Sequence, residues 1–227
     1  IAKAANILYV AEKLTDMIGK VDAILLARDD SENHSIYARP FLDAGIPIYI
    51  DKPLALTVKD AKKILSYQAF PGQIFTCSAL KYAKELQLSN EQIHSLGKIY
   101  YIKAVVPKDW DKYSIHVIDP IVQLPIDKGS ISWSVANKVG PISNLTVAYS
   151  KEIILSIESV GEIVTPIKIS IYGDLSNIEL EFVDTFSAFK LALRTFINNV
   201  VAESYTEITG SVLEVVKLIE LGRLRND

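Results

Sequence analysis

Cysteine, long hydrophobic runs and clusters of like charge are all scarce in this 227-residue sequence. The single cysteine, Cys77, excludes an internal disulfide and is typical of a reducing compartment, so we expect a cytoplasmic protein. The longest apolar runs, such as residues 23–27, have the length of a strand, whereas a membrane span needs roughly 20 residues. We therefore expect no membrane partner, and nothing at the start of the sequence resembles a signal peptide.

The distribution of charge excludes two further classes of function. The formal net charge is −3, and the Lys and Arg residues are scattered along the chain. Because a nucleic-acid surface needs a concentrated basic stripe, we expect no nucleic-acid partner. Hard-metal sites need several converging oxygen ligands, and the acidic pair Asp29-Asp30 has no further partner at suitable spacing, so no metal site is predicted.

The first third of the chain alternates between short apolar runs and amphipathic segments. The apolar runs are typical of strands covered on both faces, and they span residues 21–27, 46–50 and 73–77. Two segments with helical periodicity lie between them, at 32–44 and from 57 to about 67. Strand–helix alternation with short connections predicts an α/β fold with a parallel sheet and right-handed crossovers.

The sequence also marks the ends of both predicted helices. In the first helix four apolar residues recur at helical spacing, namely Ile36, Pro40, Phe41 and Ala44. Gly45 is predicted to end that helix. In the second helix Thr57 is expected to cap the N-terminus, with the carboxylate of Asp60 at position N3.

The rest of the chain is rich in strands and closes with two helices. Alternating patterns predict a largely antiparallel, open-faced sheet, with strands near 98–106, 130–139, 144–150, 152–159, 166–172 and 177–183. Gly173-Asp174 is a hairpin-type turn signal. The closing helices carry apolar stripes, one made by Phe186, Phe189, Leu193, Phe196/Ile197 and Val200/Val201, the other within 212–221. We therefore expect a first domain at 1–78 and a second, α+β domain at 79–227.

The predicted sheet has large apolar residues on both alternating sets, including Trp133, Val135, Val147 and Ile154. One face must pack on helices to form a core. Large exposed apolar patches usually mark protein–protein contacts, so we expect the other face to form a face-to-face dimer. The alternative is that the chain's own terminal helices cover that face.

Asp51-Lys52-Pro53 follows the second predicted strand directly. Ligands of open α/β sheets bind outside the carboxyl ends of the strands, and a lysine at that place is well positioned for a site. Pro53 fixes the local backbone, and the Lys52–Pro53 peptide bond is a candidate for the cis form. Without further context, the tripeptide is more typical of an ordinary surface lysine.

Two histidines stand in patterns that suggest chemistry. His34 begins a predicted helix after the first strand, where it either contacts a cofactor or caps the helix. His116 and Asp119 lie three residues apart, on one face if this segment is helical. A carboxylate beside an imidazole raises its pKa toward the range that a general base requires. The alternative is a buried His116, capped by Asp119, in a helix that only packs on the sheet.

These segments together resemble the Gfo/Idh/MocA family, named after glucose–fructose oxidoreductase and inositol dehydrogenase. The resemblance covers nearly the whole chain, and its four motifs occur in the family's order. The first motif is the apolar run at 21–27 with His34 and Asp51-Lys52-Pro53, where the family more often has Glu-Lys-Pro. The other three are Ser-Ala-Leu-Lys-Tyr-Ala at 78–83, Leu-Gly-Lys-Ile at 96–99 and Tyr-Ser-Ile-His-Val-Ile-Asp at 113–119. The two closing helices resemble the family's last two as well.

The resemblance implies roles for individual residues. In the family the lysine of Glu-Lys-Pro contacts nicotinamide and substrate, and the later histidine accepts the proton of the substrate hydroxyl. It therefore implies catalytic roles for Lys52 and His116, which we expect to face one cleft between the domains. The residues implied to bind NAD or NADP are Arg28, Asp29, His34, Asp51, Lys52 and Pro53. Those implied to bind substrate are Lys81, Tyr82, Tyr113 and Asp119.

The sequence departs from the family at two points. It contains no G-x-G-x-x-G turn, the element that holds the pyrophosphate, so we expect the chain to open within the Rossmann domain. By itself it is then expected not to bind NAD(H) measurably. Many catalytic members carry Asp four residues before the histidine, where this chain has Lys112, and Ser114 replaces a usual Gly.

The sequence thus supports two hypotheses. In the first, residues 1–78 are the remainder of a dinucleotide-binding domain and 79–227 a substrate-binding and oligomerisation domain. The protein is then an oxidoreductase that transfers a hydride between NAD(P) and a sugar or polyol. The resemblance also implies a homodimer or homotetramer through the sheet of the second domain. In the second hypothesis, the chain is a catalytically inactive, oligomerising or sugar-sensing relative with the same fold.

Overall fold

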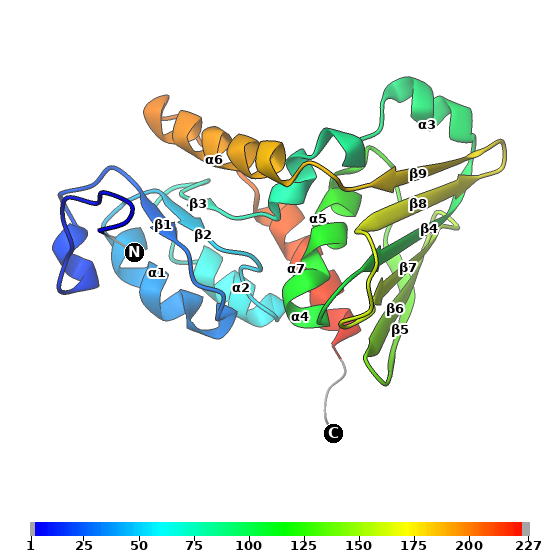
Figure 1. The fold of residues 1–227 in the computed structure, drawn as a ribbon, viewed down its shortest axis with the longest axis horizontal. Coiled ribbons are helices and arrows are strands. Elements are labelled where there is room, and N and C mark those ends of the chain that lie inside the picture. Colours follow the sequence, from blue (N-terminus) through cyan, green and yellow to red (C-terminus); the bar gives the residue numbers. More distant parts are fainter. Residues whose placement is uncertain (1–2, 224–227) are drawn as a thin grey trace.

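The computed structural model describes residues 3–223, and the first domain is built on a small parallel sheet (Figure 1). Its strands lie in the order β1-β2-β3, with β1 at Ile24–Leu26, β2 at Ile48–Ile50 and β3 at Ile74–Phe75. The helices before and between them are η1 (Leu14–Met17), η2 (Ser31–Asn33), α1 (His34–Asp43) and α2 (Val58–Leu65). The predicted partial Rossmann-like sheet is confirmed.

The two faces of this sheet are covered unequally. One face packs on α1 and α2 and buries Ile24, Leu26, Ile48, Ile50 and Ile74. The residues in between point to the other face, where Leu25 is 57% exposed. The prediction of strands covered on both faces therefore holds only in part. Val21 lies outside the strand and is exposed as well.

The predicted helix ends are confirmed, but of the four residues in the predicted apolar stripe of α1 only Phe41 is buried. Gly45, at φ 72°, follows the end of α1, and the side chain of Thr57 accepts a hydrogen bond from the Asp60 N–H at 3.1 Å. Ile36 is 65% exposed and Ala44 is exposed too. The face that α1 buries has the helical spacing i, i+4, i+7, i+8 and consists of His34, Ala38, Phe41 and Leu42.

The second domain contains a six-stranded sheet in the order β5-β6-β7-β4-β8-β9. Its strands are β4 (Ile99–Val106), β5 (Ile131–Val139), β6 (Ile142–Tyr149), β7 (Ile154–Ser159), β8 (Lys168–Gly173) and β9 (Asn177–Glu181). Only the pair β4–β7 is parallel. The hairpin at Gly173 is present, since its N–H donates to the Ser176 carbonyl at 2.9 Å. The predicted, largely antiparallel sheet is confirmed.

Two helices cover one face of this sheet and form the core of the domain. They are α5 (Ile115–Gln123) and α7 (Thr209–Gly222), which pack against its strands. Figure 1 shows no helix of the described chain over the opposite face. The alternative that the terminal helices cover that face is therefore wrong, because α7 contributes to the core side.

The uncovered face is more polar than predicted. Val147 is fully buried and belongs to the alternating set that faces the core. Trp133 and Val135 on β5 do point outward, at 52% and 51% exposure. Across the middle of the sheet, the outward positions of neighbouring strands pair to form a polar row, which consists of Thr146, Ser156, Lys103, Ser170 and Glu179.

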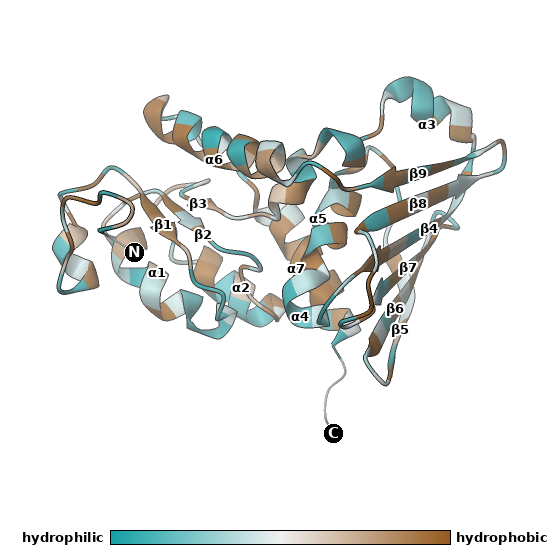
Figure 2. Ribbon diagram, in the orientation of Figure 1, coloured by the Kyte–Doolittle hydropathy of each residue, from teal (hydrophilic) through white to brown (hydrophobic). Residues whose placement is uncertain are grey.

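The helix α6 (Thr185–Val201) shows its apolar stripe to the outside. It buries Ala188, Ala192 and Phe196, whereas much of the predicted stripe lies on the exposed side: Phe186, Phe189, Leu193, Ile197 and Val201. Figure 2 shows the apolar bands along α6 and over most of α7 (Figure 2). The small alanines lie inward because α6 lies against the η3 segment (Ala79–Tyr82).

The last two helices also contact the first domain. The Phe196 ring lies 5.6 Å from the rings of both Tyr49 and Phe75, and Val212 and Val216 of α7 join the core of the first sheet. The domain boundary near residue 78 stays a prediction. The structure adds that the C-terminal helices hold the two sheets together.

The remaining helices are η4 (Lys84–Leu86), α3 (Asn90–Leu96) and α4 (Trp110–Tyr113). No helix within residues 3–223 has both the length and the apolar character to cross a membrane. Over the same residues, no group of three or more His, Cys, Asp and Glu side chains is arranged to hold a metal ion.

Candidate active site

The carboxyl ends of β1 and β2 face α4 and α5 of the second domain. Lys52 follows β2, and the Lys52–Pro53 peptide bond is cis, as its sequence allowed. The Lys52 Nζ donates a hydrogen bond of 3.3 Å to the carbonyl oxygen of Lys112, near the end of α4. A cation there satisfies a carbonyl that the short helix leaves free. The segment between β2 and α2 is thereby joined to the second domain at Lys52.

The ring of Tyr113 lies at the centre of the arrangement. The Lys52 Nζ is 5.9 Å from the centroid of this ring, and the His116 ring contacts it edge-on, at a centroid distance of 5.2 Å. Lys52 comes from the first domain, and His116 from α5 of the second. Tertiary structure therefore brings both predicted catalytic residues to one tyrosine, although 64 positions separate them.

His116 and Asp119 share a helix face as predicted, but Ser78 connects them. The Ser78 Oγ lies 2.9 Å from the His116 Nδ1, and the Ser78 N–H donates to the Asp119 carboxylate at 2.7 Å. Ser78 is fully buried, and the other two are at least nine-tenths buried. Within residues 3–223, no hydrogen bond to the His116 Nε2 is formed. Ser78 thus fixes one ring nitrogen and leaves the other available.

The prediction that Asp119 raises the pKa of His116 is wrong. Burial and the nearby charges of Lys52 and Lys108 lower the pKa of His116 from 6.5 to about 3. Burial raises the pKa of Asp119 to about 6, although Lys81 and the Ser78 N–H favour its charged form. His116 is therefore neutral at pH 7, because burial and, after it, two nearby ammonium groups oppose its protonation.

His34 has a structural position. Its ring is fully buried, with Nδ1 3.1 Å from the Leu54 carbonyl oxygen and Nε2 2.8 Å from the Arg28 carbonyl oxygen. It connects the segment after β1 to the one after β2. Any influence on a bound cofactor therefore passes through these two segments, and the direct contact that the resemblance implied finds no free ring atom.

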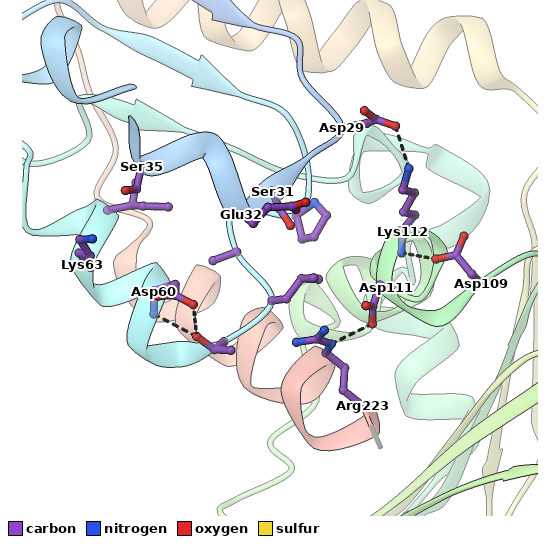
Figure 3. A pocket seen from close by; sticks show the side chains of 15 residues that line it. Asp29, Ser31, Glu32, Ser35, Asp60, Lys63, Asp109, Asp111, Lys112 and Arg223 are labelled. Atoms are coloured by element: carbon purple, nitrogen blue, oxygen red, sulfur yellow. Dashed lines mark hydrogen bonds and ion pairs between the residues drawn. The ribbon is translucent and has the colours of Figure 1, made fainter. Parts of the chain in front are cut away.

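The segment after β1 carries two further predicted residues. Arg28 donates two hydrogen bonds to Asp30, at 2.8 and 2.6 Å, and lies over the ring of Tyr37. Asp29 forms an ion pair of 2.8 Å with Lys112. Figure 3 shows this pair reaching from one domain to the other at the rim of a groove of about 670 Å³ (Figure 3). Lys112, which stands where many relatives have Asp, thus links the domains.

Lys81 and Tyr82 lie apart from the Tyr113 ring. Lys81 approaches the rings of Phe75 and Tyr82, at 5.9 and 5.2 Å, and its charge acts on Asp119. Burial raises the pKa of Tyr82 above its ordinary value. Both side chains border a hollow with Gln87 and Gln123, so a substrate at Tyr113 would reach them only if it extended that far.

A second groove lies between α6 and the open face of the first sheet, and it extends to the carboxyl ends of β1 and β2. It has a volume of about 590 Å³, and its lining is almost wholly apolar, from Leu25, Ala27 and Tyr49 on one side to Phe186, Phe189 and Leu193 on the other. Asp51, predicted to bind a cofactor, lines its edge. A flat heteroaromatic ring fits such a wall, because apolar pockets with few polar groups are typical of cofactor sites.

Sequence reasoning missed Ser78 as a participant and missed Lys108 altogether. Ser78 stood inside a motif, but nothing in a single sequence shows that its hydroxyl reaches a residue 38 positions away. Lys108 donates a hydrogen bond of 2.6 Å to the Tyr113 hydroxyl. The spacing of five residues gave no signal, because the backbone between them turns.

Comparisons with known proteins point to oxidoreductases. Residues 1–77 match the model of an oxidoreductase family, Gfo/Idh/MocA, with an NAD-binding Rossmann fold. Comparison with curated proteins finds no match. The fold is similar to a probable dehydrogenase from Thermotoga maritima, with 14% identity, a TM-score of 0.78 and coverage of 96% of this chain and 83% of that one.

Two further solved structures share the fold. The first is UDP-N-acetylglucosamine 3-dehydrogenase from Acidithiobacillus ferrooxidans, with 12% identity, a TM-score of 0.77 and coverage of 98% of this chain and 84% of that chain. The second is myo-inositol 2-dehydrogenase from Lactobacillus plantarum, with 14% identity, a TM-score of 0.77 and coverage of 96% and 83%. At these identities the similarity shows the architecture alone.

Proposed function

We propose that this protein transfers a hydride between NAD(P) and a sugar or polyol, a proposal that the match of residues 1–77 to the Gfo/Idh/MocA oxidoreductase model supports. The observation that carries the proposal is the contact of Lys52 and His116, from different domains, with the ring of Tyr113. Hydride leaves a carbinol carbon only as its hydroxyl proton is removed, so such a site needs a proton acceptor beside a group that orients the oxygen.

In the proposed reaction each residue has a defined task. His116 accepts the hydroxyl proton at Nε2, which requires that its Nδ1–H donates to the Ser78 Oγ. That hydroxyl already accepts the Leu80 N–H at 3.2 Å, so its position is fixed on both sides. Lys52 orients the substrate oxygen by donating a hydrogen bond to it. An oxidised nicotinamide held beside these residues would supply the hydride acceptor.

The residues at the carboxyl ends of β1 and β2 fit the nicotinamide half of the cofactor. The apolar groove beside α6 offers a wall for the ring, and Asp51 and Lys52 offer polar contacts next to it. Arg28, Asp29 and Pro53 belong to the same two segments. We propose that these residues hold that half, while the choice between NAD and NADP depends on contacts with the other ribose.

The direct test of the proposed function is an activity assay. The protein expressed from its complete reading frame should reduce NAD+ or NADP+ when it is supplied with cyclic polyols and aldoses, as followed at 340 nm. Failure with both cofactors over the whole panel, from a preparation that unfolds cooperatively, would favour the inactive, sugar-sensing alternative.

The 227-residue chain by itself should bind NADH too weakly to measure. It contains no G-x-G-x-x-G turn, and the backbone amides of that turn supply most contacts to the pyrophosphate. Titration calorimetry with NADH and NADPH checks this expectation. A dissociation constant in the micromolar range would show that other residues hold the pyrophosphate.

We also propose that the open face of the six-stranded sheet mediates association into a dimer or tetramer. Trp133 and Val135 would supply the apolar part of the contact, and the polar row beside them the hydrogen bonds. Light scattering at low micromolar concentration should give at least twice the monomer mass, and Trp133→Glu should shift it to the monomer. The matched control is Val164→Glu, a fully exposed apolar position outside the sheet. A monomeric wild type would contradict the proposal.

A further inference from the structure

Lys108 has a backbone conformation that few residues other than glycine adopt. Its φ is 62°, in the left-handed region that a Cβ atom disfavours. The surroundings hold it there: Lys108 and Gly161 exchange two backbone hydrogen bonds, and the Ser159 Oγ donates to the Lys108 carbonyl at 2.6 Å. Strained backbone that neighbouring contacts enforce is concentrated at functional sites.

This conformation directs the lysine to the candidate active site. The Lys108 Nζ lies 2.6 Å from the Tyr113 hydroxyl and 4.6 Å from the centroid of its ring. Lys52 approaches the same ring from the first domain, at 5.9 Å. Two ammonium groups from different domains therefore share one half-buried tyrosine, and both act on His116.

Neither ammonium group is neutralised by a close carboxylate. Over residues 3–223, the polar contact of Lys52 is the Lys112 carbonyl and that of Lys108 is the Tyr113 hydroxyl, and neither lysine forms an ion pair within 4 Å. Asp109 and Glu162 act on Lys108 only from longer range. Two like charges beside a buried imidazole repel one another and disfavour its protonation, unless an anion lies between them.

We propose that Lys108 and Lys52 together bind an anionic group of the substrate, so that the preferred substrate is a sugar or polyol bearing a carboxylate or a phosphate. This inference rests on the proposed function, because it names the substrate class of that same site. An anion bound by the two lysines would offset their charge at His116 and so raise the pKa of the imidazole in part, while burial, the larger cause of the lowering, would remain. Binding of such a substrate would thereby make the imidazole a stronger proton acceptor.

The test compares three sugars that differ in charge: D-glucose, D-glucuronate and D-glucose 6-phosphate. Turnover of each is measured with NAD+ and NADP+, and binding is measured as the shift in melting temperature of the protein with cofactor present. We expect at least one anionic sugar to have a kcat/KM roughly tenfold or more above that of glucose, as one charge-assisted hydrogen bond provides. The uronate and phosphate arms identify which anion is preferred.

Lys108→Gly is the informative variant, because it removes the ammonium and relieves the backbone strain together. We expect an unchanged or higher melting temperature, and a KM for the anionic sugar raised roughly tenfold or more, with little change for glucose. The matched control is Glu152→Gly, which relieves a similar φ of 63° at an exposed site and should leave every KM unchanged.

The outcomes separate this inference from the proposed function. Turnover of glucose with no preference for an anion, and no effect of Lys108→Gly, would overturn the anion site while the dehydrogenase stands. Binding of an anionic sugar that is lost in Lys108→Gly, without turnover of any sugar, would support the anion site and contradict the proposed function. The anion site would be overturned if the protein neither binds nor turns over either of the two anionic sugars.

Discussion

We expect His116→Asn to lower kcat/KM by roughly 10²- to 10⁴-fold, the range that a positioned proton-transfer group contributes. Asparagine has a similar size and can still hydrogen-bond to the Ser78 Oγ, but it cannot accept the substrate proton. KM should change much less than kcat, because the interaction lost is one of the transition state. Steady-state kinetics at pH 7 on the best substrate of the panel measures both.

The control for this prediction is His94→Asn. His94 is exposed on α3, and its Nδ1 lies within hydrogen-bond distance of the Asn90 carbonyl oxygen of the same helix, so its loss should leave the kinetics unchanged. The kcat/KM of Ser78→Ala should lie between those of the two histidine variants, because this change removes the group that orients His116 but keeps the imidazole. Wild-type activity of His116→Asn would exclude His116 as the proton acceptor.

His116 should also make the protein sensitive to acid. Its pKa is about 3 in the folded chain and ordinarily 6.5, so the unfolded chain binds the proton more readily as the pH falls. The stability that neutral His116 allows is complete above about pH 6.5 and is lost progressively toward pH 3. Between pH 7 and pH 4 this amounts to about 3 kcal/mol, at 1.36 kcal/mol per pKa unit. Between pH 7 and pH 4, the free energy of unfolding of His116→Asn should therefore rise by that amount relative to the wild type.

Ionisation of Asp119 should change the stability of the protein with pH in the opposite direction. Burial raises its pKa from 3.8 to about 6, so its favourable contribution is present below about pH 4 and is lost as the pH rises through 6. Asp119→Asn keeps an oxygen for the Ser78 N–H and removes the ionisation. From pH 4 to pH 8, the free energy of unfolding of this variant should rise by about 2 kcal/mol relative to the wild type.

Urea unfolding of the wild type and both variants at several pH values measures these differences. Subtracting the wild-type curve removes the contributions of all other groups. Two difference curves that run in opposite directions with pH are expected. A flat curve for His116→Asn would show that the imidazole is protonated, or solvated, in the folded protein.

Local sequence decided much of the architecture. Buried strands, the Thr57 cap, the end of α1 at Gly45 and the hairpin at Gly173 follow from interactions within a few residues, which a single sequence contains. The same holds for the helix that places His116 and Asp119 on one face. The parallel order of the first sheet followed from strand–helix alternation, because short connections leave few topologies.

Tertiary structure decided which faces are buried. The stripe of α6 and Ile36 of α1 have the apolar character of core residues, yet they are exposed, because the sheet and the η3 segment contact the other sides of these helices. Val147 and Val135 are indistinguishable by type, and only the register of β6 with β7 and β5 separates core from surface. Periodicity shows which residues share one face of a helix or strand, but the neighbouring element decides whether that face is buried.

The chemistry of the site depended on tertiary structure most of all. The sequence by itself determined which residues carry functional groups at element ends, above all Lys52 and His116, since local strand and helix signals place them there. Only the folded chain decided that Ser78 comes between His116 and Asp119, that Lys112 pairs with Asp29, and that Lys108 joins Lys52 at Tyr113. These contacts join residues of different elements, and the charge around an imidazole is the sum of such contacts, which no spacing along the chain encodes.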